Sequence, residues 1–357
     1  MSRLRAFGAS AVQGRVRAFG ASARRGRLGG FAAVVCIAAI GIACATPVLA
    51  YLKLGTRVGD RLVTLRFNTM PVRYFVTNRD VPFVTAPQLR DAVGRAFASW
   101  SGAPNVTIAS EFAGFVSFNP LPGDRANVIG FVNRPDLDRV LGSTSFTVDT
   151  VSGEILESDI FFNSSFAWSA AQGGDGRHDI ESIALHEVGH MFGLAHAMLG
   201  ETDLTGTDRR VIAAESVMFP IAFSVGTINR TLRADDIAGI ADIYGTDAFR
   251  SSTGGISGRV TKNGAGVLGA HIVAFNPATG KLVGGFSLSP DGTFVVAGLE
   301  PGPQVLRVEP LDDGDITSFL DASLNIDINF KPAFHNRLVT VPRGGTAANV
   351  ELKVVPK

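Results

Sequence analysis

Three histidines and one glutamate are the residues whose types and spacing point most directly to chemistry in this chain of 357 residues. On a helix, His186 and His190 are four residues apart and share one face, so both imidazoles can bind one ion. His196 would lie about 9 Å farther along a continued helix and off that face. Gly193 can end the helix in the left-handed conformation and turn the chain back. We therefore predict three imidazole ligands to one zinc ion, with the open fourth position of a catalytic site.

Glu187 follows His186 directly and lies about 100° around the helix, beside the predicted ligands. Its carboxylate can take a proton from a zinc-bound water, whose pKa the metal lowers to about 7, and later pass that proton to a leaving amine. Two histidines and a glutamate at this spacing also occur in helices that bind no metal. The added Gly193 and His196 have no packing role that we can identify. The pattern therefore predicts a catalytic zinc site with Glu187 as its general base.

Helices and short strands are predicted on both sides of this segment. Apolar residues at helical spacing, from Leu89 to Trp100, indicate a helix over residues 85–100. Further helices are expected at 180–192 and 234–244. Strands are expected at 71–76, 106–108, 128–132, 144–148 and 160–163. The fold class is therefore α+β, with a first domain over residues 51–248.

The sequence changes in character after Tyr244. Residues 249–255 include Ser251, Ser252, Gly254 and Gly255, which is typical of a linker. Seven evenly spaced strands follow, separated by turns rich in glycine and proline. They are expected at 256–260, 270–275, 282–288, 293–296, 304–308, 338–341 and 350–354. We predict a small antiparallel β-sandwich over residues 256–357.

The first fifty residues resemble an export signal. Seven arginines precede an uncharged apolar run over residues 31–50, and Ala50 suits cleavage by a signal peptidase. The run is also long enough to anchor the chain in a membrane if it is not cut. Cys36 and Cys44 both lie in this run, so no disulfide is expected in the mature protein. We expect a secreted or extracytoplasmic protein, with a membrane anchor over residues 31–50 as the alternative.

Charge and composition exclude some other classes of function. With 46% hydrophobic and 18% charged residues, the chain is ordinary for a globular protein. Residues 51–357 hold 26 basic and 32 acidic side chains, which disfavours nucleic acid as a partner. Hydrolysis of glycans would need a pair of carboxylates flanking the sugar, and the sequence indicates none.

A few other residues could bind metal but have simpler explanations. Asp175, Gly176 and Asp179 could provide oxygen ligands for Ca²⁺, although an acidic loop that caps the next helix explains them equally well. His178, His271 and His335 have no partner at ligand spacing, and we expect them to be surface or hydrogen-bonded residues.

The segment from His186 to His196 resembles the HExxHxxGxxH signature of the metzincin metallopeptidases. The resemblance implies a turn with a methionine beneath the metal, and Met218 in Ser216-Val217-Met218-Phe219-Pro220 is similar to it. Within the metzincins the chain most resembles the matrixins, the matrix-metalloproteinase-like group. Residues 71–75, 153–163 and 232–245 carry this resemblance. It implies a twisted mixed sheet with packed helices.

The chain departs from the matrixin pattern in four ways. Residues 199–214 are longer than the family implies and suggest an insertion near the cleft. We expect no cysteine-switch propeptide before the catalytic unit. No histidine lies between Tyr51 and Arg177, so the second, structural zinc of animal matrixins is not expected. No tyrosine closely follows Met218, so a fifth protein ligand is not expected either.

The C-terminal strands resemble the carboxypeptidase regulatory-like, transthyretin-like module. Residues 258–260, 269–274, 291–294 and 298–302 carry the resemblance. These segments are mostly turn glycines and alternating core residues, so they predict a fold and little about function.

We therefore expect an exported zinc endopeptidase that acts on protein or peptide substrates, with Glu187 as the catalytic base. The alternative is a non-catalytic surface-binding or adhesion protein that uses the metalloprotease fold as a scaffold. The sequence does not predict the cleavage preference, the activation mechanism or the oligomeric state.

Overall fold

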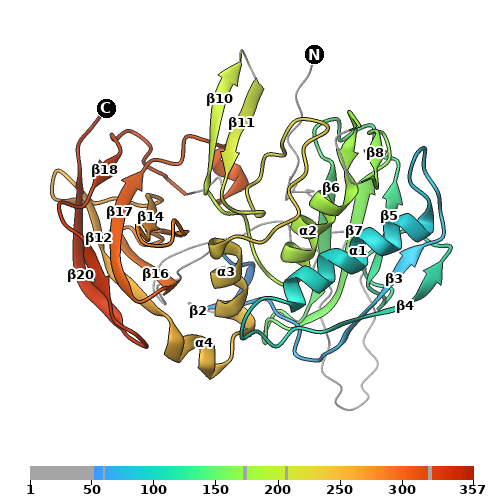
Figure 1. Cartoon of the computed structure of the whole chain (residues 1–357), viewed down its shortest axis with the longest axis horizontal. Helices are drawn as coiled ribbons and strands as arrows, with labels where there is room; N and C mark the ends of the chain where they lie inside the picture. The colour runs from blue at the N-terminus through green and yellow to red at the C-terminus, as the bar shows by residue number, and fades with distance from the viewer. Residues whose placement is uncertain (1–51, 59–60, 172–174, 206–207, 321–323) are drawn as a thin grey trace, which may run out of the picture.

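The computed structural model describes residues 52–58, 61–171, 175–205, 208–320 and 324–357. The arginine-rich and apolar N-terminal segment, with Cys36 and Cys44, lies outside these residues. The chain forms two lobes, with α3 and the β10–β11 hairpin between them (Figure 1).

The first lobe contains a five-stranded mixed sheet. Its strand order is β4-β3-β5-β7-β6, and only the edge strand β6 runs antiparallel to its neighbour. The strands are β3 (Val72–Thr77), β4 (Ser110–Val116), β5 (Val128–Val132), β6 (Gly142–Val148) and β7 (Ile155–Asn163). The predicted strand at 106–108 is wrong, because Val106 forms only a single bridge to Gly245 and the strand begins at Ser110.

Helices α1 (Ala86–Ser101) and α2 (Ile180–Met191) pack against each other and against this sheet. Thr85 caps α1 in a capping box with Gln88, which explains why the helix begins there. The apolar face of α1 is buried, and the indole of Trp100 donates a hydrogen bond of 2.8 Å to the carbonyl of Leu185. This contact fixes α1 beside the middle of α2.

Short strand pairs complete the first lobe and the region between the lobes. They are β1 (Gly55–Val58) with β2 (Arg61–Thr64), β8 (Trp168–Ser169) with β9 (His178–Asp179), and β10 (Gly200–Thr205) with β11 (Asp208–Ala214). The β10–β11 hairpin is the segment that the sequence suggests as an insertion.

Helix α3 (Ala234–Tyr244) joins the two lobes. Ile240 and Tyr244 belong to the core of the first lobe, and Ala238 belongs to the core of the second. Helix α4 (Asp247–Ser252) follows, and β12 begins at Gly254. Residues 249–255, which the sequence predicts as a linker, are therefore helical and then extended, because α4 continues directly into the first strand of the second lobe.

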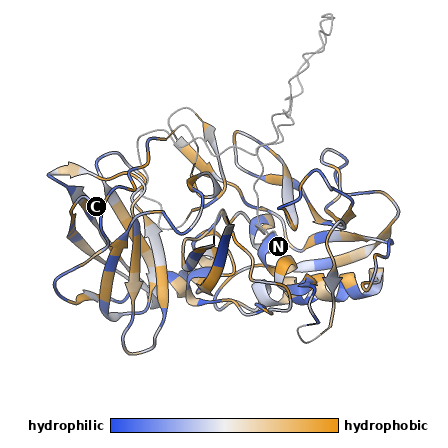
Figure 2. Ribbon diagram, turned by 90° about the horizontal axis from the view of Figure 1, so that it is seen from above, coloured by the Kyte–Doolittle hydropathy of each residue, from blue (hydrophilic) through white to orange (hydrophobic). Residues whose placement is uncertain are grey.

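The second lobe, here called the C-terminal β-region (residues 254–354), contains two sheets. The first contains β12 (Gly254–Lys262), β13 (Ala265–Gly266), β16 (Thr293–Leu299) and β20 (Thr346–Val354). The second contains β14 (His271–Phe275), β15 (Leu282–Phe286), β17 (Gly302–Glu309), β18 (Ala333–Phe334) and β19 (Val339–Val341). Buried residues recur at alternate positions along β17 and in the second half of β20, whereas β14 and β15 are buried almost throughout. Figure 2 shows both hydrophobic and hydrophilic residues in this lobe, and the apolar side chains of both sheets share one core.

The prediction that these strands are all antiparallel is wrong for one pair. The C-terminal strand β20 pairs in parallel with β12, from Gly255 opposite Thr346 to Lys262 opposite Val354. The chain returns to β12 from the other sheet rather than through a hairpin, so the two strands run in the same direction.

A third apolar cluster lies where the two lobes meet. It combines Leu52 near the start of the described chain, residues that follow α2, residues that follow Met218, and residues of the C-terminal β-region. Its buried members are Leu52, Ala195, Met198, Ala214, Phe219, Ile221, Phe286, Leu311, Phe319 and Leu320. We call it the inter-lobe cluster.

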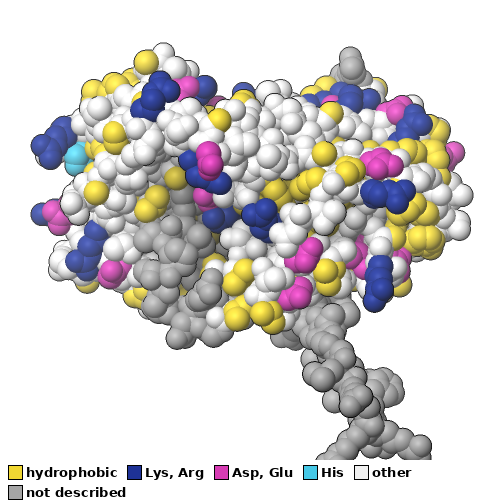
Figure 3. Space-filling model, turned by 90° about the horizontal axis from the view of Figure 1, so that it is seen from below, with side chains coloured by type: hydrophobic (Ala, Val, Ile, Leu, Met, Phe, Trp, Pro, Cys, Tyr) yellow, Lys and Arg dark blue, Asp and Glu magenta, His cyan; other side chains and the backbone are white. Residues whose placement is uncertain are grey.

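On the face of the molecule drawn in Figure 3, basic and acidic side chains are interspersed.

Candidate metal centre

Helix α2 carries two of the three predicted metal ligands and the predicted base. Asp179 caps its first turn by accepting a hydrogen bond of 2.8 Å from the backbone N–H of Ser182. His186, Glu187 and His190 are all buried, with at most 8% of any of these residues exposed. Helix α2 is thus a core helix, and these three polar side chains are enclosed within the protein.

The chain reverses at Gly193, as the sequence predicts. Gly193 has a φ of +95°, and a side chain there would bring a Cβ to 2.3 Å from the carbonyl oxygen of Leu65. Both the left-handed conformation and the close approach of Leu65 therefore require glycine. The reversal carries His196 back beside α2, where it is also buried.

The structure brings His186, His190 and His196 together. One ring nitrogen from each lies within 4.8 Å of the others. Nε2 of His190 and Nε2 of His196 are 3.1 Å apart. Among the described residues, this is the one group of three or more histidine, cysteine or acidic side chains whose geometry suits a metal ion.

The opposite nitrogen of each ring contacts a backbone carbonyl. Nδ1 of His186 lies 2.6 Å from the carbonyl oxygen of Val217, and Nδ1 of His190 lies 2.8 Å from that of Leu194. Nδ1 of His196 lies 2.5 Å from the carbonyl oxygen of Ser318. A carbonyl can only accept a hydrogen bond, so each Nδ1 carries the proton and each Nε2 presents a lone pair.

Lone pairs that face each other at 3.1 Å repel unless a cation lies among them. Burial lowers the pKa of His190 to about 4 and that of His196 to about 3. Burial, together with the neighbouring histidines, also lowers the pKa of His186 well below its usual value. The three rings are therefore neutral near pH 7, which is the form that binds metal. The donor set fits a zinc ion.

Glu187 lies beside this group and is held by a strand of the sheet. The hydroxyl of Thr144, in the edge strand β6, donates a hydrogen bond of 2.7 Å to Oε2 of Glu187. Oε1 has no hydrogen-bond partner in the described structure. Burial raises the pKa of Glu187 to about 8, and the hydrogen bond from Thr144 opposes this shift. A carboxylate with one oxygen held and the other available is suited to proton transfer.

Met218 lies directly beneath α2, in a turn organised by α3. The Oδ1 atom of Asp236 accepts hydrogen bonds from the hydroxyl of Ser216, at 2.5 Å, and from the backbone N–H of Val217, at 3.0 Å. The carbonyl of Val217 then faces His186. The turn therefore links a carboxylate in α3 to the ring of a predicted ligand.

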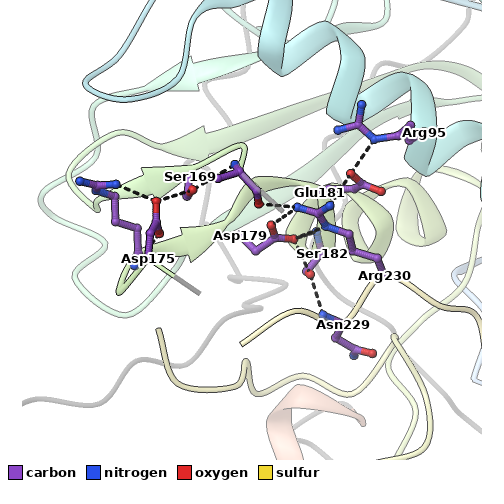
Figure 4. Close-up of polar contacts among 10 residues, drawn as sticks. Arg95, Ser169, Asp175, Asp179, Glu181, Ser182, Asn229 and Arg230 are labelled. Atoms are coloured by element: carbon purple, nitrogen blue, oxygen red, sulfur yellow. Dashed lines mark hydrogen bonds and ion pairs between the residues drawn. The ribbon is translucent and has the colours of Figure 1, made fainter. Parts of the chain in front are cut away.

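The acidic residues considered for Ca²⁺ are occupied by other groups (Figure 4). Asp175 accepts hydrogen bonds from Ser169 and Arg177, each at 2.7 Å. Asp179 accepts from Ser182 and forms a buried ion pair with Arg230. These contacts favour the helix-capping explanation over a calcium site.

The three remaining histidines lie away from the candidate centre. His335 is half-buried and contacts the carbonyl of Arg337, while buried His271 contacts Glu309 at 2.9 Å. His178 is buried between the rings of Phe166 and Trp168, so it is not a surface residue. Burial lowers its pKa to about 4.

Sequence reasoning missed three groups around the centre. Thr144 and Asp236 are polar residues in elements that were predicted, but no spacing rule relates them to α2. Ser318 contributes a backbone carbonyl, which every residue type carries. None of the three has a sequence signal that could have identified it.

Comparison with known proteins places the centre within a matched region. Residues 66–245 match the family model of the matrixins. Metalloendoproteinase 2-MMP of Arabidopsis thaliana is 27% identical over 164 residues, which cover 45% of this chain and 38% of that protein. Metalloendoproteinase 1 of Glycine max is 29% identical over 182 residues, which cover 46% of this chain and 49% of that protein. The chain thus spans less than half the length of these relatives.

Proposed function

The chain belongs to the matrixin family of metallopeptidases, and from this premise we propose that it is an exported zinc-dependent endopeptidase. The observation that carries the proposal is the convergence of three buried imidazoles, each oriented by a backbone carbonyl, beside the buried carboxylate of Glu187. In this proposal His186, His190 and His196 hold zinc. Gly193 and Met218 support them, by the chain reversal and by packing beneath α2.

Zinc, when bound, supplies a Lewis acid that polarises a carbonyl and makes water acidic. Glu187 takes a proton from the attacking water on Oε1 and later delivers it to the leaving amine. Burial alone would keep this carboxyl protonated near neutral pH, since its pKa is raised to about 8. A nearby divalent cation favours the charged form. The two opposing effects leave Glu187 able to exchange a proton at neutral pH.

The edge strand β6 is the proposed docking edge for the substrate. In the described structure β6 pairs only with β7, so its outer edge can accept an extended peptide as an added strand. Thr144 lies in β6 and bonds to Glu187. A peptide paired with this edge would therefore lie close to the proposed base.

Export and the role of the C-terminal β-region are further parts of the proposal. The arginines followed by an apolar run before Tyr51 support a leader or an anchor. Within the described part of the chain, no helix has the length and hydrophobicity needed to span a bilayer. The separate core of the C-terminal β-region supports a second domain of the carboxypeptidase regulatory-like type.

A peptidase assay on the full chain tests the proposal. Zinc-loaded protein should cleave casein or a library of quenched fluorogenic peptides, lose activity with a chelator, and regain it when zinc is restored. Absence of cleavage by protein that holds one zinc per chain would instead support a scaffold that binds surfaces. Mass spectrometry of the cleaved peptides would then define the sequence preference.

A further inference from the structure

One group that contacts the candidate metal centre comes from the far end of the chain. The carbonyl of Ser318 lies 122 residues from His196 and contacts its Nδ1 at 2.5 Å. The carbonyls that contact His186 and His190 belong to Val217 and Leu194, inside the matched residues 66–245. Ser318 lies outside that region. The third histidine is therefore oriented by a part of the chain that the matrixin match does not include.

The segment that carries Ser318 is firmly held against the first lobe. We call residues 311–320 the return segment, because here the chain leaves β17 and comes back to α2. Leu311, Phe319 and Leu320 are buried in the inter-lobe cluster together with Ala195 and Met198. The ring of Phe319 also meets the ring of His196 edge to face, with 6.5 Å between centroids.

Polar contacts tie the same segment to the β10–β11 hairpin, beside which it lies (Figure 1). Asp313 accepts a hydrogen bond of 2.9 Å from the backbone N–H of Thr202. The hydroxyl of Thr202 donates to the backbone carbonyl of Asp313, also at 2.9 Å. The hairpin therefore also helps to hold the return segment in place.

We infer that the return segment is a working part of the metal centre, with Ser318 as a positioning residue for His196. His196 lies beyond the end of α2, so the helix does not fix its ring as it fixes those of His186 and His190. By accepting the Nδ1 proton, the carbonyl of Ser318 selects the tautomer whose Nε2 faces the other two rings. The C-terminal β-region, through this segment, therefore orients the third ligand.

This inference rests on the proposed zinc site, and its test measures zinc rather than peptide cleavage. In the full chain, the hydroxy-acid analogue of phenylalanine at position 319 replaces the Ser318–Phe319 peptide bond with an ester. The ester weakens the Ser318 carbonyl as an acceptor but keeps both side chains. It also removes the N–H of Phe319, which donates to the carbonyl of Ile316 at 2.9 Å.

A matched control is available one residue further on. The N–H of Leu320 donates to the same carbonyl of Ile316, also at 2.9 Å. The hydroxy-acid analogue of leucine at position 320 therefore removes an equivalent hydrogen bond and leaves the Ser318 carbonyl as an amide. Any difference between the two esters reports on the contact with His196.

The zinc dissociation constant, measured by competition with a chelator, should rise about 10-fold for the ester at 319 and remain near the wild-type value for the ester at 320. The visible spectrum of the Co²⁺-substituted protein should change only for the ester at 319. Equal effects of the two esters, or no effect at 319, would overturn the inference. If the zinc-loaded wild type fails to cleave peptides, the proposed function is wrong. The zinc dissociation constants of the two esters would still test the role of Ser318.

A pair of simple substitutions provides a second test. Phe319→Ala loosens the return segment, whereas Phe294→Ala removes an equally buried ring from the core of the C-terminal β-region. Phe319→Ala should weaken zinc binding by 10-fold or more, and Phe294→Ala should lower the unfolding temperature without that loss. Tight zinc binding by folded Phe319→Ala would contradict the inference.

Discussion

The sulfur of Met218 packs directly on the backbone of Gly189 in α2. A Cβ added at Gly189 would lie 2.4 Å from this sulfur and 2.7 Å from the ring of Trp100. Gly189 lies between Glu187 and His190, so the turn that carries Met218 supports the helix directly behind the candidate ligands. The glycine at this position is therefore required by packing, not by backbone conformation.

Gly189→Ala should destabilise the protein and weaken zinc binding. Overpacking a core costs about 1–3 kcal/mol, and alanine returns about 1 kcal/mol of helix propensity. Gly94→Ala in α1 is the matched control, since its Cβ would meet only the hydroxyl of Tyr74 at 3.7 Å. Urea unfolding should show a lower free energy of unfolding for Gly189→Ala than for wild type, and no decrease for Gly94→Ala. Equal stability of the two variants would contradict this packing argument.

Glu187→Gln should retain zinc and lose peptide hydrolysis. The amide keeps the shape of the side chain and can still contact Thr144, but it cannot take a proton. Loss of a general base typically lowers turnover by about 10²–10⁴-fold. Glu181→Gln, nearly two turns earlier on α2, is the control and should keep most of the activity. Substantial turnover by Glu187→Gln would show that another group is the base.

Gly142→Ala should reduce turnover while zinc binding is preserved. A Cβ at Gly142 in β6 would lie 2.9 Å from Oε1 of Glu187 and 3.2 Å from its Cδ. The buried carboxylate must therefore move, and a displacement of about 1 Å can cost up to about 10²-fold in rate. Steady-state kinetics and zinc content of the same sample would measure both effects. A loss of zinc that accounts for the lost rate would argue against displacement of Glu187.

The local elements of the site could be predicted because each depends on short-range spacing. His186 and His190 share a helix face, Gly193 must turn the chain, and α3 has the bounds 234–244 that its pattern predicts. The error at residues 106–108 has a physical reason. Val106 and Ile108 are apolar because they pack against other elements individually, not because they alternate along a strand.

The contacts made across the fold could not be predicted in this way. The contact of Thr144 with Glu187 depends on where β6 lies over α2, and the pairing of β20 with β12 depends on the order of strands in two sheets. The contact of Ser318 with His196 spans 122 residues and uses a backbone atom. Such contacts are set by tertiary packing, about which the spacing of residues in one sequence says nothing.

Asp235 should make the stability of the protein depend on pH. It is buried at the junction of the lobes, where its Oδ1 accepts a hydrogen bond of 2.8 Å from the N–H of Gly284. Burial and the neighbouring Asp236 raise the pKa of Asp235 from 3.8 to about 8. Between about pH 4 and pH 8, the folded state therefore holds a proton on Asp235 that the unfolded chain has already released.

The sign of the effect follows from this difference. A group whose pKa is raised on folding stabilises the protein when protonated, and this contribution is lost as the pH rises through the folded pKa. Between pH 6 and pH 9 the loss is about 2–3 kcal/mol. Asp235→Asn resembles the protonated form and keeps an oxygen for Gly284, so it should lose less stability over this interval than wild type.

Urea unfolding of the zinc-loaded proteins at pH 6 and pH 9 measures the difference directly. Other buried carboxyls, such as Glu187, are common to both proteins and cancel in the comparison. Asp136→Asn is a suitable control, because Asp136 is exposed and its hydrogen bond with Arg134 lowers its pKa. Between pH 6 and pH 9, the free energy of unfolding of Asp136→Asn should change as much as that of wild type. If the stability of Asp235→Asn changes with pH as much as that of wild type, the carboxyl of Asp235 is not protonated in the folded protein at neutral pH.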